Sequence, residues 1–576
     1  MPRSPSSSPS RVAVLVLALL AAGGCGRSGT SGPAAELAMV GGEILTVDDA
    51  GTVAQALAIH GDSLVAVGSD AEVAAWIGPD TRVVELDGRT VIPGLTDNHF
   101  HGIGGGPGVD LSGARSLADV EAALAARAAT TPAGEVIVTN SDWHEGQLAE
   151  QRLPYRDDLD AATPEHPVVV VRGGHQYVLN SAALERWGIR RDAPPVAGGR
   201  IGRYPDGRLN GELVDRAKGL VELDGPEGPA TDPGEELLDE HRRLHALGLT
   251  SVRYPGGSVE RYELLRDLHR EGRLTMRVDQ LFRAGRGGTV DELLAHLDEA
   301  GIAPGEGDER LWVGGVKISI DGGFEGGWMR EPYREPWGED GRFSGLQTVD
   351  SAVYVAMVRR LHEAGWRVAT HAVGDAAMDL VLHAYRQAHA DASLVGRRWS
   401  VEHGFIARPE HLETMRELGV AASVQNHLYV AAPSLVAYWG TDRAHHTTPL
   451  RDYLDAGVET SLGTDSPVIP ENPFWVLHHF TTRETMSDGV AGDEQAVGRM
   501  EALRAATRGY AWLTFGEERR GSLEAGKLAD LVLLSDDYRS CADPCLQTME
   551  ARATLVGGQV VHSTLAELPV QGSVPD

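Results

Sequence analysis

The apolar residues after residue 90 fall into short runs that alternate with longer amphipathic segments. The segments between the runs, such as residues 351–363 "SAVYVAMVRRLHE", carry apolar residues at helical spacing. With an opening run at residues 91–102, "VIPGLTDNHFHG", the pattern predicts eight strand–helix units, and hence an α/β fold with a closed (β/α)8 TIM-type barrel. The seven later runs, rich in Val and Ile, lie in "GLTSVRYPGG", "TMRVDQLF", "LWVGGVKISIDGG", "WRVATHAVGD", "RWSVEHGF", "VAASVQNHLY" and "VETSLGTDSP".

The interval between the first and second of these runs is too long for a simple connection. It spans about 145 residues and contains strand-like runs of its own, "EVIVTNSDW" and "HPVVVVRGGH". Because structureless loops of that length are uncommon in compact domains, the interval predicts a folded insertion. We expect residues 104–240 to form a cap over the carboxyl-terminal face of the barrel.

Short strands with tight turns flank the barrel pattern at both ends of the chain. Residues 36–86 contain strand-like runs separated by Gly41-Gly42 and by Gly61-Asp62. The carboxyl-terminal runs "GSLEAGKLADLVLLSDD" and "ATLVGGQVVH" return to the same pattern. We therefore expect residues 36–90 and 515–576 to complete one β-sandwich around a barrel domain at 91–514.

The first 35 residues differ in character from the rest of the chain. Residues 12–22, "VAVLVLALLAA", form an uncharged run that is shorter than the roughly 20 apolar residues of a membrane-spanning helix. The run fits a secretory signal peptide at 1–25, and Cys25 after small residues resembles a bacterial lipobox. This predicts an exported protein that is lipidated at Cys25 and tethered to a bacterial membrane by residues 26–35. An ordinary signal peptide with an incidental cysteine is the alternative.

The charge of the chain narrows the range of partners. A net charge of −31 argues against nucleic acid, because phosphate binding needs a basic face. The two remaining cysteines, Cys541 and Cys545 in "CADPC", are expected to form a local disulfide or to stay as two free thiols. Oligomeric state stays open, and a small molecule is the expected substrate.

Ionisable residues gather at the ends of the predicted barrel strands. His99 and His101 lie two residues apart at the end of the first strand, so both imidazoles face one side. Single histidines of this kind are more often structural than ligands, but the joint arrangement at the rim where barrel enzymes build their sites predicts a metal centre. The later members are Lys317 within the fourth strand and His371, His403 and Asp465 at the ends of the fifth, sixth and eighth.

These motifs resemble the amidohydrolase superfamily, and more narrowly its branch that includes N-substituted formamide deformylase. The resemblance rests on "PGLTDNHFHG", "VRGGHQYVLNSAAL", "GGVKISIDGG", "THAVGDAAMD", "VEHG", "GTDSPV", "LRAATRGYA" and "GSLEAGKLADLVLL" and covers nearly the whole chain after the tether. It implies one or two Zn²⁺ ions, with Mn or Fe as alternatives, at His99, His101, His371, His403 and Asp465. It also implies that Lys317 can be carboxylated, since a carbamate is an anionic oxygen ligand whereas an amine is not.

The chemistry implied by this site is hydrolysis by metal-activated water. Zinc lowers the pKa of bound water to about 7 and polarises a carbonyl group. Asp465 takes the proton of the attacking water and passes it to the leaving amine. We expect hydrolysis of a non-peptide amide bond. Hydrolytic deamination, or hydrolysis of a cyclic amide or an ester, is an alternative on the same scaffold, and a surface-anchored binding protein without turnover is an alternative of another class.

Three further residues are expected to contact the substrate. His175 in "RGGHQYVLNS" and Trp143 in "DWHEG" lie in the predicted cap. His427 follows Asn426 in "SVQNHLY", where the related family usually has Gln-Pro, and this rim of the seventh strand normally meets substrate.

Overall fold

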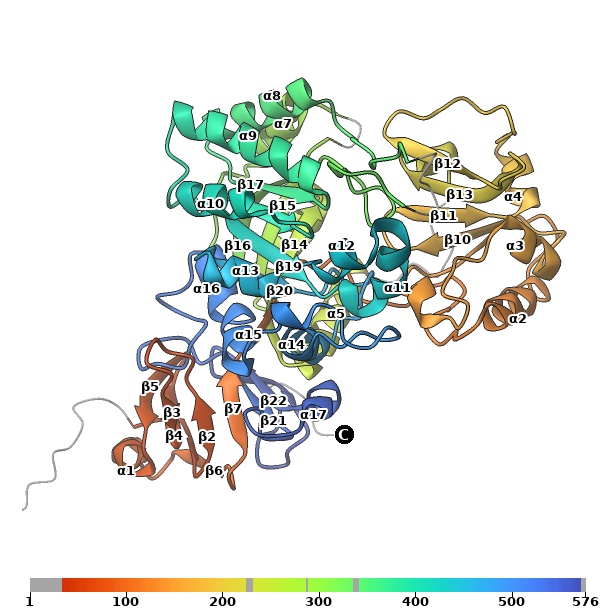
Figure 1. Cartoon of the computed structure of the whole chain (residues 1–576). Helices are drawn as coiled ribbons and strands as arrows, with labels where there is room; N and C mark the ends of the chain where they lie inside the picture. Colours follow the sequence, from red (N-terminus) through yellow and green to blue (C-terminus); the bar gives the residue numbers. More distant parts are fainter. Residues whose placement is uncertain (1–33, 224–231, 286–287, 335–340, 571–576) are drawn as a thin grey trace, which may run out of the picture.

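The computed structural model describes residues 34–223, 232–285, 288–334 and 341–570, and its centre is an eight-stranded parallel barrel (Figure 1). The ends of the sheet meet where the Asn98 N–H donates to the Leu462 carbonyl at 3.2 Å, and this closure confirms the predicted barrel. The strands, in spatial order, are β8 (Leu95–Asp97), β14 (Leu249–Gly257), β15 (Arg277–Arg283), β16 (Leu311–Ser319), β17 (Val368–Ala372), β18 (Ser400–His403), β19 (Ala421–Gln425) and β20 (Thr460–Gly463).

Helices surround the barrel because each buries one apolar face against it. In α8 (Ser351–Glu363), Tyr354, Val358 and Leu361 are buried, and the side chain of Asp350 caps the first turn. The other covering helices include α5 (Pro233–Ala246), α6 (Val259–Arg270), α7 (Val290–Glu299), α9 (Asp375–Asp391), α10 (Pro409–Leu418), α13 (Leu450–Asp455), α14 (Pro473–Thr482), α15 (Arg499–Ala505) and α16 (Arg508–Leu513).

Both ends of the described chain build a β-sandwich below the barrel (Figure 1). Its two sheets share an apolar core that includes Met39, Leu57, Leu531 and Leu555. One sheet has the order β5 (Ser63–Gly68), β4 (Ala56–His60), β1 (Leu37–Val40) and β6 (Arg82–Glu85). The other has the order β23 (Gln559–Ser563), β22 (Ala551–Val556), β21 (Leu531–Leu534), β7 (Thr90–Pro93), β2 (Glu43–Leu45) and β3 (Val53–Ala54).

The opening run is divided between two domains at Pro93-Gly94, the step that the sequence also indicates, so the barrel starts later than the predicted residue 91. Val91–Pro93 pair with β2 and β21 in the sandwich, and the barrel strand β8 begins only at Leu95. Gly94 lies between them, where a Cβ atom would clash with the Thr250 side chain. Both halves are apolar, so hydrophobic periodicity alone cannot separate them.

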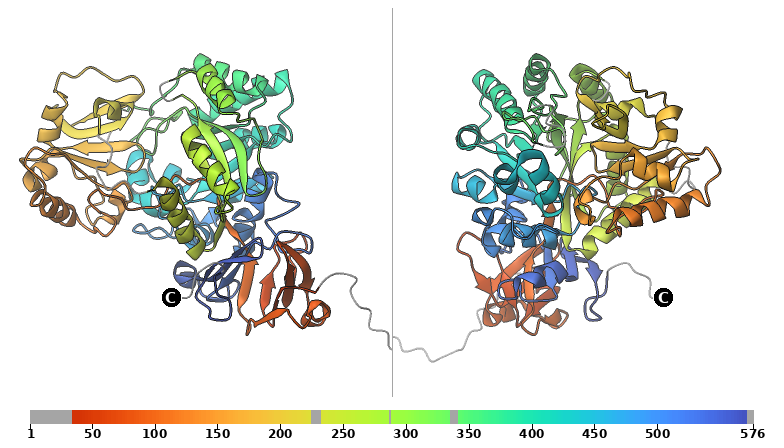
Figure 2. Two further views of the ribbon diagram at one scale, coloured as in Figure 1. Left: turned by 180° about the vertical axis from the view of Figure 1, so that it is seen from behind. Right: turned by 45° about the vertical axis from the view of Figure 1, so that its right-hand side comes forward.

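The long insertion forms a five-stranded sheet flanked by short helices, which stands beside the barrel mouth (Figure 2). Its last described part ends by residue 223, earlier than the predicted limit of 240. Helix α5 instead belongs with the barrel, because Leu237, Leu238 and Leu244 are buried in the barrel core. The cap contains β12 (Gly199–Arg203), β13 (Leu209–Asp215), β11 (Gln176–Leu179), β10 (Val168–Arg172), β9 (Ile137–Val138), α2 (Leu117–Ala128), α3 (Arg156–Ala162) and α4 (Ser181–Arg186).

The amino-terminal predictions lie outside the described residues. These are the signal peptide, Cys25 and almost all of the tether. Within the part of the chain that the structure describes, no helix is both long and apolar enough to cross a bilayer. Cys541 and Cys545 are free thiols, the second of the two expected states.

A buried ion pair joins the barrel to the sandwich, and its loss should destabilise the protein. Arg277 contacts Asp530 through Nε at 2.6 Å and through Nη2 at 2.9 Å, with both residues buried. Asp530→Ala leaves a guanidinium buried without its carboxylate, so we expect the free energy of unfolding to fall by about 3–5 kcal/mol. Urea unfolding measures this change.

The exposed pair between Arg359 and Asp391, 2.9 Å apart, supplies the control. Asp391→Ala should cost less than about 1 kcal/mol, because solvent screens exposed ion pairs. Equal losses in the two variants would show that the buried pair does not hold the domains together.

Candidate metal-dependent active site

The carboxyl ends of the barrel strands bring the predicted site residues together. His99 follows β8, His403 ends β18 and His371 lies in β17. The ring centroids of His99 and His403 are 4.6 Å apart, those of His371 and His403 4.5 Å, and those of His99 and His101 5.1 Å. The parallel topology therefore places side chains from distant parts of the sequence in one cluster.

Asp465 lies at the centre of this cluster. Its Oδ1 is 3.6 Å from His99 Nε2 and 3.4 Å from His101 Nε2, and its Oδ2 is 3.0 Å from His427 Nε2. The backbone φ of 62° and the 2.7 Å hydrogen bond from its N–H to the His99 carbonyl turn the carboxylate towards the barrel axis. The carboxylate is thus shared between two sets of imidazoles.

Two groups of potential ligands result from this sharing. His99, His101 and Asp465 form one group, and His403, His427 and Asp465 form the other. Within each group the ligand atoms lie within 4.8 Å of one another. His427 was expected to contact substrate, but the structure buries it against Asp465. The departure from Gln-Pro at this position indicated a changed rim of the seventh strand, but it did not predict the contact between His427 and Asp465.

His371 reaches the edge of the cluster without joining either group. Its Nε2 lies 3.1 Å from the Gly322 carbonyl oxygen and 3.4 Å from Asp321 Oδ1. The His371 ring stacks on His175, with centroids 5.4 Å apart. The predicted ligand is therefore adjacent to the cluster, with its Nε2 directed at the loop after β16.

Hydrogen bonds on the far side of two rings fix their orientation. His99 Nδ1 lies 2.7 Å from Glu402 Oε2, and His403 Nδ1 lies 2.7 Å from Gln425 Oε1. Partners of this kind set the tautomer and aim Nε2 at a metal. Neighbouring strand residues normally face opposite sides, but the φ of 72° at His403 lets Glu402 and His403 both reach the interior. Glu402 precedes His403 in "VEHG", but no pattern in the sequence marks it as a site residue.

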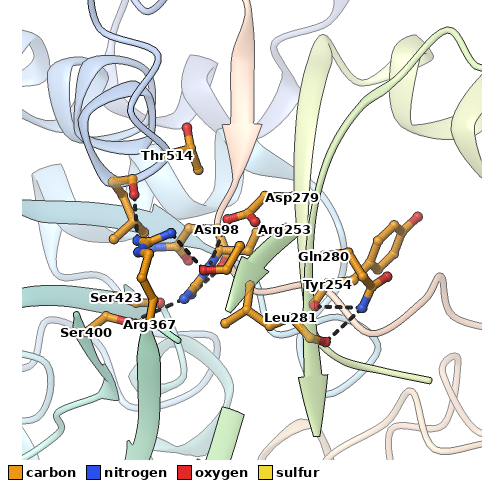
Figure 3. Close-up of polar contacts among 12 residues, drawn as sticks. Asn98, Arg253, Tyr254, Asp279, Gln280, Leu281, Arg367, Ser400, Ser423 and Thr514 are labelled. Atoms are coloured by element: carbon orange, nitrogen blue, oxygen red, sulfur yellow. Dashed lines mark hydrogen bonds and ion pairs between the residues drawn. The ribbon is translucent and has the colours of Figure 1, made fainter. Parts of the chain in front are cut away.

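A buried ionic network supports the cluster from inside the barrel (Figure 3). Arg253 donates to Glu402 Oε1 at 2.9 Å and to Ser400 Oγ at 3.2 Å, and its Nε lies 3.4 Å from Asp279. Burial by itself raises the pKa of Glu402, but Arg253 and His99 hold that pKa well below its usual range. Glu402 is therefore ionised and accepts from His99.

Burial keeps the cluster in its metal-binding protonation state. Burial, with a smaller effect of Lys317, lowers the pKa of His99 to about 4. The imidazole is then neutral near pH 7, which is the form that coordinates metals. Burial likewise lowers the pKa of Lys317 to about 7, and its Nζ lies 3.2 Å from His99 Nε2. A substantial fraction of Lys317 is therefore an uncharged amine near neutral pH.

A cavity of about 1090 Å³ opens from the cluster to the cap. Barrel residues such as His101 and Lys317 line one side, and cap residues such as His175 and Tyr177 line the other. His175 is held by Asp215, with Nδ1 2.6 Å from Oδ1. The structure thus places His175 in the wall of this cavity, on the side of the cap.

Trp143 does not reach this cavity, which corrects the prediction that it contacts substrate. The indole is 2 % exposed and packs in the apolar core of the cap with Leu148 and Val170. Its Nε1–H donates to the Val171 carbonyl at 2.8 Å. Because its N–H is hydrogen-bonded, the indole of Trp143 can be buried in the cap core without an unpaired polar group.

Comparison with known proteins agrees with the geometry. The model of the amidohydrolase family matches residues 82–562. N-substituted formamide deformylase of Arthrobacter pascens is 29 % identical over 91 % of this chain and 97 % of its own. An uncharacterised metal-dependent hydrolase from Pyrococcus horikoshii OT3 has a TM-score of 0.64 and 23 % identity, over 88 % of this chain and 99 % of its own.

A third neighbour has its metal named. Atrazine chlorohydrolase TrzN from Arthrobacter aurescens TC1, complexed with zinc, has a TM-score of 0.50 and 16 % identity over 93 % of this chain and 97 % of its own. At that identity it supports the fold alone. The family match covers most of the sequence, from the sandwich through the barrel to the last strands. This chain belongs to the amidohydrolase family and is a hydrolase of the class that acts on carbon–nitrogen bonds.

Proposed function

We propose that this protein hydrolyses a non-peptide amide bond of a small molecule with the help of bound zinc. The observation that carries the proposal is the Asp465 carboxylate, which lies within 3.6 Å of imidazole nitrogens from His99, His101 and His427 below the capped cavity. N-substituted formamides are the first substrates to test, because that is the activity named for the relative from Arthrobacter pascens.

The residues present fit zinc. Neutral imidazoles and a carboxylate are the ligands that zinc prefers, and the far-side contacts of His99 and His403 already orient them. His99, His101 and Asp465 would hold one ion, and the group of His403, His427 and Asp465, beside His371, offers a second position. When bound, zinc supplies a Lewis acid and lowers the pKa of water. We propose that carboxylation of the Lys317 amine supplies an additional oxygen ligand.

Asp465 is the proton carrier in this proposal. Although burial raises its pKa, His99 and His427 hold that pKa well below the usual range, so the carboxylate is ionised near pH 7. It accepts a proton from the attacking water and passes it to the amine nitrogen as the carbon–nitrogen bond breaks. His427, 3.0 Å from Oδ2, fixes the orientation of the carboxylate during both transfers.

We also propose that the chain is exported and anchored by a lipid on Cys25. The support is the apolar run at 12–22 followed by small residues and the cysteine. Cys25→Ala should move the protein from the membrane fraction to the soluble fraction, as immunoblotting of the two fractions would measure. A protein that stays soluble in both forms would contradict the anchor.

Asp465→Asn tests the proton carrier. The amide of Asn is close in shape to the carboxylate but cannot accept the proton, so we expect kcat on an N-alkyl formamide to fall by about 10²–10⁴-fold. Amine release measures the rate, and elemental analysis measures zinc content. Asp455→Asn, on the exposed side of α13, is the matched control. Activity of Asp465→Asn within twofold of the parent protein would refute the role.

Burial of the histidines makes stability pH-dependent. The pKa of His99 falls from 6.5 unfolded to about 4 folded, so the unfolded chain binds the extra proton between these values. The stabilisation from the neutral imidazole is complete above pH 6.5 and is lost as the pH falls towards 4, with a slope of at most about 1.4 kcal/mol per pH unit for one histidine.

Urea unfolding of the chelator-treated protein between pH 7.5 and 4.5 measures this slope. His99→Gln should flatten it, and zinc should move the loss of stability to lower pH, because metal competes with protons for the imidazoles. The same slope in the parent protein and in His99→Gln would contradict the assignment of a neutral buried imidazole.

A further inference from the structure

A second, smaller pocket adjoins the histidine–aspartate cluster and shares part of its lining, including His175, His371 and Asp465, with the large cavity. The cluster end is formed by His403, His427 and Asp465. Phe324 and Phe405 form apolar walls with rings 5.7 Å apart. Arg172 and Glu325 also line the pocket, so it combines an apolar wall with a charged end.

Arg172 is held between two buried carboxylates. Its Nη1 lies 3.1 Å from Glu325 Oε2, its Nη2 3.0 Å from Glu145 Oε1 and its Nε 2.9 Å from Glu145 Oε2. Relative exposures are 2 % for Arg172, 1 % for Glu145 and 0 % for Glu325. Arg172 ends β10 of the cap and Glu325 lies in the loop after β16, so the triad also joins cap to barrel.

The triad leaves one carboxylate oxygen for a ligand. Glu145 receives Arg172 and also the Ser434 hydroxyl, at 2.8 Å. Glu325 uses Oε2 for Arg172, whereas its Oε1 is buried and has no hydrogen-bond partner among the described residues. With two carboxylates against one guanidinium, the triad carries excess negative charge. A buried oxygen in this state favours an N–H or ammonium donor.

Gly323 lies close to this oxygen, where a side chain would crowd it. A Cβ atom on Gly323 would lie 3.1 Å from Glu325 Oε1 and 3.0 Å from the His175 ring, and Gly323 itself lines the pocket. His175 stacks on His371, which also lines the pocket. Glu325 and Gly323 therefore line the same pocket as His403 and Asp465 of the cluster, where the amide would react.

We propose that Glu325 Oε1 accepts a hydrogen bond from the N–H of the scissile amide, so that secondary amides are the substrate class. The inference rests on the proposed amide hydrolysis. Water oxygen bonds to the carbonyl carbon while one water proton moves to Asp465. The carbon–nitrogen bond then breaks, its electron pair stays on nitrogen, and Asp465 returns the proton to that nitrogen. Glu325 holds the N–H throughout and then the released amine.

An amide and an ester of the same shape distinguish binding of the scissile N–H by Glu325 from a general contribution of Glu325 to activity. The substrates are N-(2-phenylethyl)formamide and 2-phenylethyl formate, which differ only by N–H against O at the scissile bond. In Glu325→Gln, we expect kcat/KM for the amide to fall at least tenfold and that for the ester to change less than twofold. Equal losses on both substrates, or no loss on either, would overturn the proposal.

Glu145→Gln is the matched control, because it weakens the same triad but leaves Glu325 Oε1 in place. The amide-to-ester ratio should stay within twofold of the parent value in this variant, and thermal melting shows that both variants fold. A ratio that falls equally in Glu145→Gln would assign the effect to the structure of the triad and would overturn the proposal.

Product binding gives a readout that does not need turnover. Calorimetry on the zinc-loaded protein should show 2-phenylethylamine binding more tightly than 2-phenylethanol. In Glu325→Gln, the ratio of the two dissociation constants should shrink at least tenfold. If neither formyl compound is hydrolysed but amine binding still depends on Glu325, the proposed function fails while the acceptor site at Glu325 stands. Amine binding that is unchanged in Glu325→Gln would overturn the acceptor site itself.

Discussion

The buried carboxylate of Glu402 is the interaction on which the site depends. One oxygen accepts from His99 and the other from Arg253 and Ser400, so a single side chain connects His99, just after the first barrel strand, to the cation Arg253 inside the barrel. All of these groups lie away from water, where an unpaired charge is costly. The positions of the ligands are therefore set by electrostatic pairing within the barrel as much as by the strand ends.

Buried charge pairs also hold the cap at its junction with the barrel. Arg172 and Glu145 belong to the cap and Glu325 to the barrel, and all three are buried, so Glu325 reaches its partner Arg172 only when the cap is seated. The cap thereby positions His175 over His371 and closes the cavity above the cluster. Substrate selection and domain docking use the same residues, because the pocket wall is also the contact between the cap and the barrel.

Sequence reasoning predicted the eight strands and the gathering of His99, His101, His371, His403 and Asp465, because strand periodicity and parallel topology depend on local patterns. It marked the step between the two domains at Pro93-Gly94 but began the barrel domain at residue 91, which lies inside β7. It placed Trp143 in the cavity, whereas a backbone acceptor at Val171 holds the ring in the cap core. Such partners depend on the packing of distant segments.

The same limit applies to the charged residues that support the site. Glu402 stands next to the predicted ligand His403. Both side chains reach the barrel interior because His403 has an unusual φ, and amino-acid composition does not predict that backbone angle. The pairing of Arg172 with Glu145 and Glu325 spans up to 153 residues of sequence. Long-range charge pairs have no periodic signature, so they emerge only when the topology is known.

The pairing of β7 with β21 also bears on the order in which the protein can fold. Thr90–Pro93 are made early in synthesis, yet their partner strand Leu531–Leu534 and its neighbours are made last. The barrel between them can collapse while the six-stranded sheet of the sandwich still lacks β21, β22 and β23, half of its strands. Contacts this distant in sequence close slowly, so the apolar edge of β7 stays uncovered for most of translation. The sheet that contains β7 is therefore completed only when residues 531–563 have been made.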